Sequence, residues 1–332
     1  MNKRKVFLVA ETGSLSGGVR VIGDVANHLK RRGWDVSIWS LNPKETLTNW
    51  FKLEDGIDWI SFHRTGTIQD YEQLVYVLSK QDGIKVATYW RTAPAVSEAS
   101  KSGEGYYLVQ DIETSYASSP KLQVAVMDTY ELGLHHFTTS RWVEKQIDAD
   151  YMGIGVDTNF YRRIGVRKEK LMILATARQV ALKGWPVLCE LNRKLASKGL
   201  PMTMFGLQEK MRVFVPPIEY FVGLDDDHIL ELYNRASIFV STSLHEGFNL
   251  TALEAMACGT PVVKTRDDGS DEYVDDGGNC MIGKDALGLA DKVMEVLGNS
   301  DTAKTLAING QATARRYQWK DAIDRLERIF AT

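Results

Sequence analysis

Residues 238–265 read IFVSTSLHEGFNLTALEAMACGTPVVKT, the clearest unit of structure in the chain. An apolar run of strand length opens it, and a second run begins at Pro261, after Gly259. Between the runs, residues 250–258 are predicted to form a helix that ends at the glycine. The apolar runs are continuous rather than alternating, which is typical of parallel strands covered on both faces. The stretch therefore predicts strand, loop, helix and strand, with the loop at the carboxyl end of a parallel strand.

The same alternation runs through the whole chain in two halves. Strands are predicted at 6–10, 36–41, 58–63, 85–90, 106–110 and 137–140, and then at 171–177, 202–206, 219–223, 238–243, 261–265 and 280–283. Apolar spacing predicts helices between them, among them 185–198, and a last helix at 319–329. This pattern indicates an α/β protein of two doubly wound domains. We expect the seam near Gly153–Arg167, where the periodicity lapses.

Composition narrows the functional classes. The 332 residues are 44% hydrophobic and 25% charged, with a net charge of −3. Residues 1–157 hold 17 Lys and Arg against 20 Asp and Glu, and the remainder is neutral. We therefore expect no specific nucleic-acid binding and weak or absent membrane association, since only Lys3–Lys5 and Lys30–Arg32 form short basic clusters.

The cysteines and the N-terminus bear on the compartment. Three widely spaced cysteines indicate neither a disulfide framework nor a zinc site. The apolar run at 6–10 ends at Glu11 and is too short for a signal peptide or a membrane span. We expect a soluble, cytoplasmic protein.

Two glutamates, Glu246 and Glu254, lie eight positions apart around the helix start. Backbone N–H groups near Asn249 and Leu250 would face a phosphate there. The carboxylates then suit neutral hydroxyls as hydrogen-bond acceptors, because a phosphate would repel them. The alternative is a capping box formed by Thr251 and Glu254, which leaves Glu246 unexplained.

Two further loops follow predicted strands. Arg178 and Lys183 come after the strand at 171–177, and two cations at that edge suit a diphosphate, although a solvated surface pair is the alternative. Gly17 and Gly18 follow the strand at 6–10 and would let the backbone approach a phosphate or sugar. Neither GxGxxG nor GxxxxGK[ST] occurs, so the dinucleotide fingerprint and the P-loop are absent.

The glutamate motif and the two loops together resemble those of a known protein family. HEGFNLTALEAMACGTPVV resembles the E-x7-E signature of family 4 glycosyltransferases, and five other segments resemble segments of that family in the same order. They are the glycine loop with its helix (17–39), the interdomain segment (153–162), the Arg/Lys donor loop (178–184), and the post-motif loop (265–282) with the last helix (317–330).

The resemblance implies the GT-B fold, with two Rossmann-like domains facing a central cleft. It implies an N-terminal acceptor-side domain at 1–155, a nucleotide-sugar domain at 156–315, and a helix at 316–332 that crosses back to the N-terminal domain.

It also implies roles for the motif residues. By position, the donor diphosphate would be bound by Arg178 and Lys183, the ribose by Glu254 and the transferred sugar by Glu246. Backbone contacts to the donor would come from Phe248, Asn249 and Leu250, and Gly17 and Gly18 would form the opposing wall. The implied reaction is a metal-independent transfer with retention, from a UDP-, GDP- or dTDP-linked sugar to a glycan or another hydroxyl acceptor, with no further cofactor.

The chain also departs from the family pattern. Residues 89–93 read YWRTA where many members carry a histidine near the acceptor, so no histidine contact carries over. Arg91 is a candidate for an anionic acceptor or the donor phosphate, and a structural role is equally open. LVQDIE at 108–113 faintly resembles a loop of a polysaccharide rhamnosyltransferase subset, which makes Asp111 an acceptor-side candidate. Alternatively, Asp111 and Glu113 are solvated loop carboxylates.

Other features favour structural roles. Asp225–Asp227 contains DxD, but it precedes a helical stretch, where an aspartate N-cap is the commoner cause. His135 and His136 lack a third ligand at metal spacing, so no metal site is predicted. The alternatives in function are a GT-B nucleotide-sugar epimerase or hydrolase and, less favoured, a non-catalytic sugar-binding or DNA-associated protein. The sequence identifies neither the donor sugar, the acceptor nor the oligomeric state.

Overall fold

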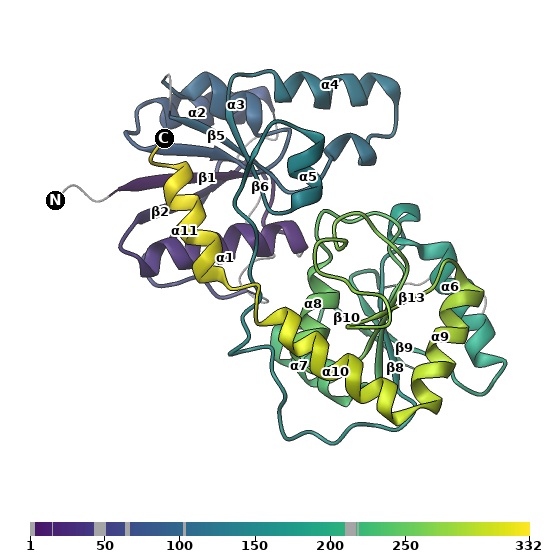
Figure 1. Cartoon of the computed structure of the whole chain (residues 1–332). Coiled ribbons are helices and arrows are strands. Elements are labelled where there is room, and N and C mark those ends of the chain that lie inside the picture. The colour runs from purple at the N-terminus through teal and green to yellow at the C-terminus, as the bar shows by residue number, and fades with distance from the viewer. Residues whose placement is uncertain are drawn as a thin grey trace. The chain divides into compact units, whose positions relative to one another are not determined.

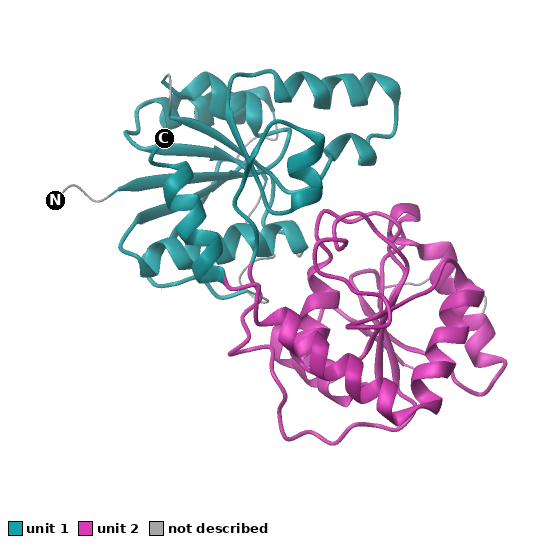
Figure 2. Cartoon of the chain, viewed as in Figure 1, with its two compact units in different colours: residues 1–154, 319–332 teal, residues 155–318 magenta. Residues whose placement is uncertain are grey.

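The computed structural model describes residues 4–14, 16–42, 51–63, 67–101, 104–209, 217 and 219–332. The chain divides into two units, residues 1–154 together with 319–332, and residues 155–318 (Figures 1 and 2). Each unit is a sheet of parallel strands with helices packed on it, which confirms the predicted α/β class.

The sheet of unit 1 has the strand order β3-β2-β1-β4-β5-β6-β7, and every neighbouring pair is parallel. Its strands are β1 (Lys5–Ala10), β2 (Asp35–Ser40), β3 (Asp58–Ser61), β4 (Ile84–Ala87), β5 (Gly105–Val109), β6 (His135–Thr138) and β7 (Asp150–Tyr151). The first six correspond to predicted strands. The edge strand β7 was not predicted, because its two residues, Asp150 and Tyr151, form no apolar run.

The helices of unit 1 include one from the far end of the chain. They are α1 (Gly17–Arg31), α2 (Ile68–Ser79), α3 (Ala93–Ala99), the 3-10 helix η2 (Glu113–Tyr116), α4 (Pro120–Tyr130), α5 (Arg141–Gln146) and α11 (Trp319–Ile329). The Trp34 indole N–H donates to Glu327 of α11 at 2.8 Å, and Arg32 pairs with the same carboxylate at 2.6 Å. These bonds and the buried face of α11 hold the last helix on unit 1.

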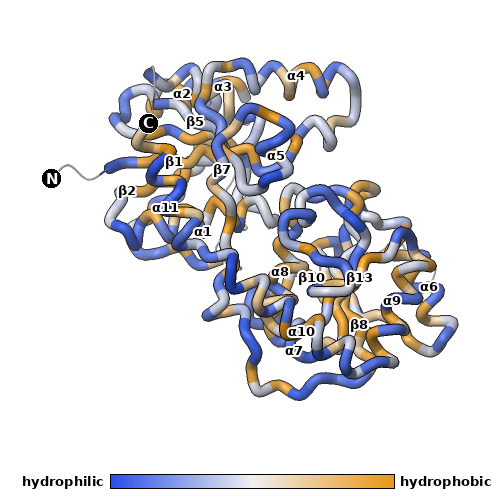
Figure 3. The backbone as a smooth tube through the Cα atoms, viewed as in Figure 1, coloured by the Kyte–Doolittle hydropathy of each residue, from blue (hydrophilic) through white to orange (hydrophobic). Residues whose placement is uncertain are grey.

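The sheet of unit 2 has the order β10-β9-β8-β11-β12-β13, again with parallel pairs throughout. Its strands are β8 (Ile173–Ala177), β9 (Thr203–Gly206), β10 (Glu219–Val222), β11 (Ile238–Ser241), β12 (Val262–Lys264) and β13 (Met281–Ile282). All six were predicted, with their ends within three residues. Figure 3 shows apolar residues along the strands and mixed polarity along the helices.

The helices of unit 2 cover this sheet through apolar faces. They are the 3-10 helix η3 (Ala181–Lys183), α6 (Trp185–Ala196), α7 (Asp226–Arg235), α8 (Leu250–Ala257), α9 (Ala286–Gly298) and α10 (Ser300–Ala314). The leucines that predicted α6, Leu188, Leu191 and Leu195, are all buried in one core with residues of β8 and β11. None of the helices that the structure describes is long and apolar enough to cross a membrane.

One predicted strand end is wrong, and its position matters. The apolar run 85–90 predicted a strand to Trp90, but β4 ends at Ala87. The Thr92 hydroxyl accepts hydrogen bonds from the N–H groups of Thr88 and Tyr89 at 3.2 and 3.3 Å. It thereby turns the chain out of the sheet, so residues 89–91 form a loop at the carboxyl end of β4.

Each sheet has one point where the order of strand addition reverses. In unit 1 it lies between β1 and β4, and in unit 2 between β8 and β11. Ligands of open α/β sheets bind at the carboxyl ends of the strands at such a switch point. The predicted site residues follow these same four strands, except Asp111, which follows β5.

Candidate functional site

In unit 2, the loops after β8 and β11 are joined to each other. The backbone N–H groups of Leu244 and His245 both donate to the Leu182 carbonyl oxygen, at 2.9 and 3.1 Å. Gly184 has a left-handed backbone with φ 67°, and a Cβ atom there would lie 1.7 Å from the Thr242 carbonyl oxygen. A glycine is therefore required for this approach of the two loops.

Lys183 and Glu246, predicted from separate motifs, form an ion pair in this joint. The Lys183 Nζ lies 2.8 Å from Glu246 Oε2 and also donates to the His245 carbonyl oxygen at 2.9 Å. The Ser243 hydroxyl donates to the other carboxylate oxygen at 2.6 Å. The two side chains are 8% and 16% exposed, so the pair interacts in an environment of lower effective dielectric than the surface.

Arg178 lies directly after β8 and is half-buried. Unlike Lys183, it forms no ion pair with any part of the chain that the structure describes. The two cations therefore differ in state, one already paired and the other available to an anion. Their shared role on a diphosphate remains a prediction.

The N-terminus of α8 is open. Asn249 precedes the helix in a left-handed conformation (φ 66°, ψ 59°), and its side chain makes no capping hydrogen bond to the first turn. Asparagine is normally a good N-cap, but here its amide nitrogen donates to Ser241 Oγ and Asp267 Oδ2, at 3.1 and 2.8 Å. The first N–H groups of α8 are therefore left for another acceptor, which is the arrangement that binds anions at helix N-termini.

The capping-box interpretation is wrong, because the helix begins elsewhere. Thr251 lies inside α8, and its hydroxyl donates to Asn249 Oδ1 at 3.2 Å instead of accepting from the backbone. Glu254 is only 6% exposed, and its Oε2 accepts from the Tyr233 hydroxyl at 3.1 Å. The predicted ribose contact of Glu254 therefore starts from a carboxylate that is already bonded to α7.

The remaining motif residues of this loop are fixed by packing. Phe248 is buried against the rings of Tyr273 and Tyr317, while Leu250 is half-buried at the start of α8. The loop after β12 lies against the same turn, since a Cβ atom on Gly269 would be 2.2 Å from the Glu246 carbonyl oxygen. The Glu246–Asn249 turn is thus held from both sides.

In unit 1, the predicted glycine loop opens α1. The N-cap is Ser16, whose hydroxyl accepts from the Val19 N–H at 3.2 Å, and Gly17 and Gly18 are half-buried in the first turn. A Cβ atom on Gly18 would lie 3.5 Å from the Gln110 amide. The structure therefore brings the glycine loop together with the loop after β5, although the sequence analysis predicted the two loops separately.

The acceptor-side candidates lie in these loops of unit 1. Arg91 pairs with Glu11 at 3.3 Å, and its guanidinium lies 4.7 Å from the centre of the Trp90 ring. Asp111 accepts hydrogen bonds from the Tyr116 hydroxyl at 2.6 Å and from the Ile112 N–H at 2.8 Å. Arg91 thus lies at the switch point of unit 1 and Asp111 in the loop after the neighbouring strand β5, each with partners from its own unit.

Glu113 is not a solvated loop carboxylate, as one interpretation of the sequence held. It is 8% exposed, accepts from the Trp90 N–H at 3.2 Å, and is hydrogen-bonded to the Tyr107 hydroxyl. Burial raises the pKa of Glu113 to about 8. The sequence offered no signal for this, because the partners come from β5 and from the loop after β4.

The DxD segment at 225–227 and the two histidines, for which the sequence favoured structural roles, have partners close by in the chain. Asp225 caps α7 by accepting from the His228 N–H at 3.0 Å, so the N-cap interpretation of the DxD segment is confirmed. His135 pairs with Asp150 at 2.7 Å, and His136 contacts the Asp148 carbonyl oxygen at 3.3 Å. The described residues contain no cluster of three His, Cys, Asp or Glu side chains that could hold a metal ion.

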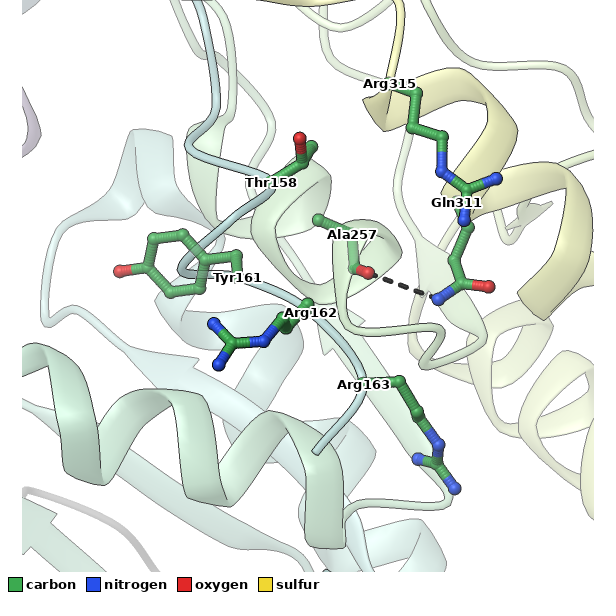
Figure 4. Close-up of a pocket in the computed structure, with 7 residues that line it drawn as sticks. All are labelled: Thr158, Tyr161, Arg162, Arg163, Ala257, Gln311 and Arg315. Atoms are coloured by element: carbon green, nitrogen blue, oxygen red, sulfur yellow. Dashed lines mark hydrogen bonds between the residues drawn. The ribbon is translucent and has the colours of Figure 1, made fainter. Parts of the chain in front are cut away.

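A pocket of about 200 Å³ lies elsewhere in unit 2 (Figure 4). Ala257, at the C-terminal end of α8, forms part of its wall, and the Gln311 amide donates to the Ala257 carbonyl oxygen at 3.4 Å. Arg162 and Arg163 point away from each other in the view (Figure 4). The pocket is therefore at the opposite end of α8 from Asn249 and is distinct from the candidate site.

Comparisons with known proteins agree with this architecture. Residues 216–313 match the family model described as glycosyl transferases group 1. An uncharacterised glycosyltransferase of Methanocaldococcus jannaschii is 30% identical over 106 residues, which are 31% of this chain and 30% of that protein. The chain thus spans about a third of the length of that curated relative.

Solved structures match over nearly the whole chain. The sucrose-phosphate synthase of Thermosynechococcus elongatus superposes with a TM-score of 0.81 at 16% identity, covering 99% of this chain and 98% of that one. Anabaena HepE, in complex with UDP and glucose, gives 0.77 at 17% identity, with 98% of both chains covered. The motifs, the family match over residues 216–313 and the fold together support a family 4-like glycosyltransferase with the GT-B fold.

Proposed function

We propose that the protein is a retaining glycosyltransferase that moves a sugar from a nucleotide-diphosphate sugar to a glycan or another hydroxyl acceptor, without a metal ion. The observation that carries this proposal is the Lys183–Glu246 pair beside the uncapped start of α8, at the switch point of unit 2. A cation, a hydrogen-bond acceptor and free backbone N–H groups are what a sugar bound to a diphosphate requires. The complex of Anabaena HepE with UDP and glucose supports a UDP-linked donor as the first one to test.

The residues divide the chemistry as follows. Arg178 and Lys183 stabilise the negative charge that develops on the departing diphosphate, which is the largest demand of this step. The bond from the sugar C1 to the phosphate oxygen breaks while a bond to the acceptor oxygen forms on the same face. The departing phosphate oxygen takes the acceptor proton, so no side-chain base is needed. Glu246 orients the sugar through its hydroxyl groups, and its own charge is balanced by Lys183.

A nucleotide-sugar epimerase or hydrolase is the competing function. An epimerase needs carboxylates or a histidine to act as acid and base at the sugar. The carboxylate closest to the proposed sugar position, Glu246, is held by Lys183 and Ser243. A group with both oxygens bonded is suited to orienting a substrate, and this favours transfer.

The testing experiment is a screen of UDP-, GDP- and dTDP-linked sugars against the purified protein. We expect one donor to raise the melting temperature and to be consumed slowly by hydrolysis, and consumption to accelerate when a hydroxyl acceptor is added. EDTA should leave turnover intact, because two protein cations already serve the diphosphate. Isomerisation of the sugar without transfer would establish an epimerase, and an absolute requirement for Mg²⁺ or Mn²⁺ would exclude the proposed charge stabilisation.

A further inference from the structure

A second charged pair lies beneath the candidate site, and the proposed function does not use it. Lys264, the last residue of β12, and Asp267, three residues later, have fully buried side chains with Nζ and Oδ2 2.8 Å apart. The Lys264 ammonium also donates to the Thr265 carbonyl oxygen at 2.6 Å. Removing two charges from water is costly, and an apolar pair of similar volume is often as stable. A contribution to global stability therefore does not account for the pair.

Its bonds lead to one residue, Asn249. Asp267 Oδ2, the oxygen that meets Lys264, also accepts from the Asn249 amide nitrogen at 2.8 Å. Its other oxygen accepts from the Ser270 N–H at 2.9 Å, which fixes the carboxylate in the loop. On the far side of the same amide, Ser241 Oγ accepts at 3.1 Å. The Asn249 side chain is therefore held from two directions.

This restraint decides what happens at the start of α8. An asparagine before a helix normally turns its side chain onto the first-turn N–H groups. In this chain the amide nitrogen donates to Asp267, and the Asn249 side chain makes no capping hydrogen bond to the first turn. The left-handed backbone of Asn249 is held as well, because the Tyr273 hydroxyl donates to the Asn249 carbonyl oxygen at 2.8 Å.

We infer that Lys264 and Asp267 are a positioning pair that keeps the N-terminus of α8 open for the phosphate groups of the donor. Lys264 pairs with the buried Asp267 carboxylate, Asp267 holds the Asn249 amide away from the helix, and the first-turn N–H groups remain available. The inference rests on the proposed function, since it names what prepares the diphosphate site. It assigns a role to two residues that the motif resemblance left without one.

The inference predicts a particular pattern of affinity. Asp267→Asn keeps the shape of the side chain but removes the charge and one acceptor, so Asn249 is released to cap α8. Binding of the nucleoside diphosphate should weaken about tenfold or more, the scale of a favourable anion contact at a helix N-terminus. Binding of the corresponding nucleoside, which lacks the phosphates, should not change. A variant that merely loosens the fold would weaken both.

The experiment is isothermal titration of the full chain with UDP, GDP and dTDP, with the matching nucleosides, and with pyrophosphate as a base-free probe. The variants are Asp267→Asn, Lys264→Met and Ser241→Ala, the last of which removes the second acceptor of the same amide without burying an unpaired charge. Lys85→Met is the matched control. It removes a buried ammonium (1% exposed) that pairs with Glu104 at 3.1 Å in unit 1, and it should lower stability without changing affinity for any phosphate ligand.

The outcomes separate the two proposals. Selective loss of diphosphate and pyrophosphate affinity in Asp267→Asn and, to a smaller extent, in Ser241→Ala supports the positioning pair. Wild-type diphosphate affinity in a folded Asp267→Asn or Ser241→Ala protein overturns it, as does an equal loss of nucleoside affinity. If the wild-type protein itself binds none of the three diphosphates, the proposed function fails first and this inference falls with it.

Discussion

The two switch points are built from the same topology but prepared differently. In unit 2 the loops after β8 and β11 are bonded to each other, the ion pair between them is largely buried, and the helix that follows is uncapped. In unit 1 the helix after β1 is capped by Ser16, and the Arg91–Glu11 pair is 53% and 27% exposed. A preformed site is thus found in unit 2, where the charged diphosphate is proposed to bind.

This difference indicates which unit stabilises the charge of the substrate. Fixed dipoles and charges act strongly when they are held in place before the ligand arrives, as in unit 2. In unit 1 the corresponding cation is balanced by a partner in water, and such exposed pairs contribute little. We infer that unit 2 accounts for the charge chemistry, and that the loops of unit 1 distinguish acceptors by shape and hydrogen bonding.

The largest effect should come from forcing apart the two joined loops of unit 2, after β8 and β11. Gly184→Ala places a Cβ atom 1.7 Å from a backbone oxygen at a residue with positive φ, so the two loops have to separate. We expect the free energy of unfolding to fall by about 3 kcal/mol or more. Chemical denaturation measures this.

Gly17→Ala is the matched change at the switch point of unit 1. No atom lies within 4 Å of the added Cβ, and the position begins a helix. Its stability should stay within about 0.5 kcal/mol of the wild type, as for other unstrained surface sites. Equal losses in the two variants would contradict the claim that only the unit 2 loops are tightly joined.

The next effect separates the two cations of unit 2. Lys183→Ala and Arg178→Ala should each cost about 2–4 kcal/mol in transition-state stabilisation, measured as kcat/KM for donor consumption. Only Lys183→Ala should also destabilise the fold, by about 3 kcal/mol, because it leaves the Glu246 carboxylate poorly solvated and unpaired. Adding Glu246→Gln to Lys183→Ala should restore much of the stability but not the activity. Near-normal turnover in both single variants would refute the proposed role of these cations.

A third test compares how the stability of each unit depends on pH. The pKa of Glu113 is raised to about 8 in the folded protein, so between pH 4.5 and 8 the folded chain holds a proton that the unfolded chain has lost. Stability from this group is therefore complete at acidic pH and is lost as the pH rises toward 8. Glu113→Gln, which mimics the neutral acid, should remove that slope in denaturation experiments. An unchanged slope would show that Glu113 is ionised in its buried site.

Unit 2 should show the opposite sign. Burial lowers the pKa of Lys168 to about 8, and its Nζ donates to the Ala236 carbonyl oxygen at 2.7 Å. The unfolded chain then binds the extra proton between pH 8 and 10.5, so stability rises with pH across that range. Lys168→Met should flatten this rise, and hydrogen exchange resolved by peptide can assign each slope to its unit.

Much of this fold could be predicted because its signals are local. The apolar runs located twelve of the thirteen described strands, and the leucine spacing of α6 located its buried face. The Lys183–Glu246 contact could be predicted from the topology, because both residues follow strands that are neighbours in a doubly wound sheet.

What escaped prediction depends on long-range burial. Lys264 lies in the predicted strand at 261–265, and nothing in that run indicates that its charged side chain is fully buried against Asp267. Glu113 looks like a loop carboxylate until Trp90 and Tyr107 are brought to it by other strands. No spacing rule contains those partners, because they are set by the packing of the whole unit.

The smallest expected effect concerns binding to membranes, because the two units differ little in net charge. A basic residue near an anionic surface contributes about 1 kcal/mol, so a cluster needs several free cations to bind. In the cluster Lys30–Arg32, Lys30 donates to the Gly56 carbonyl oxygen at 2.6 Å, and Arg31 pairs with Glu54 at 2.7 Å. Arg32 is bonded to α11, and Lys3 of the other cluster lies outside the described residues.

We therefore expect less than tenfold enrichment on liposomes containing anionic lipid, measured by co-sedimentation at physiological salt. Glu54→Gln releases Arg31 without touching the candidate site, and it should raise binding slightly at low salt, where screening is weak. Strong binding of the wild-type protein at physiological salt would show that the paired cations exchange partners at a surface. The acceptor would then have to be sought among lipid-linked glycans. In that case unit 1 would meet its substrate at a membrane surface, and unit 2 would bind the donor from solution.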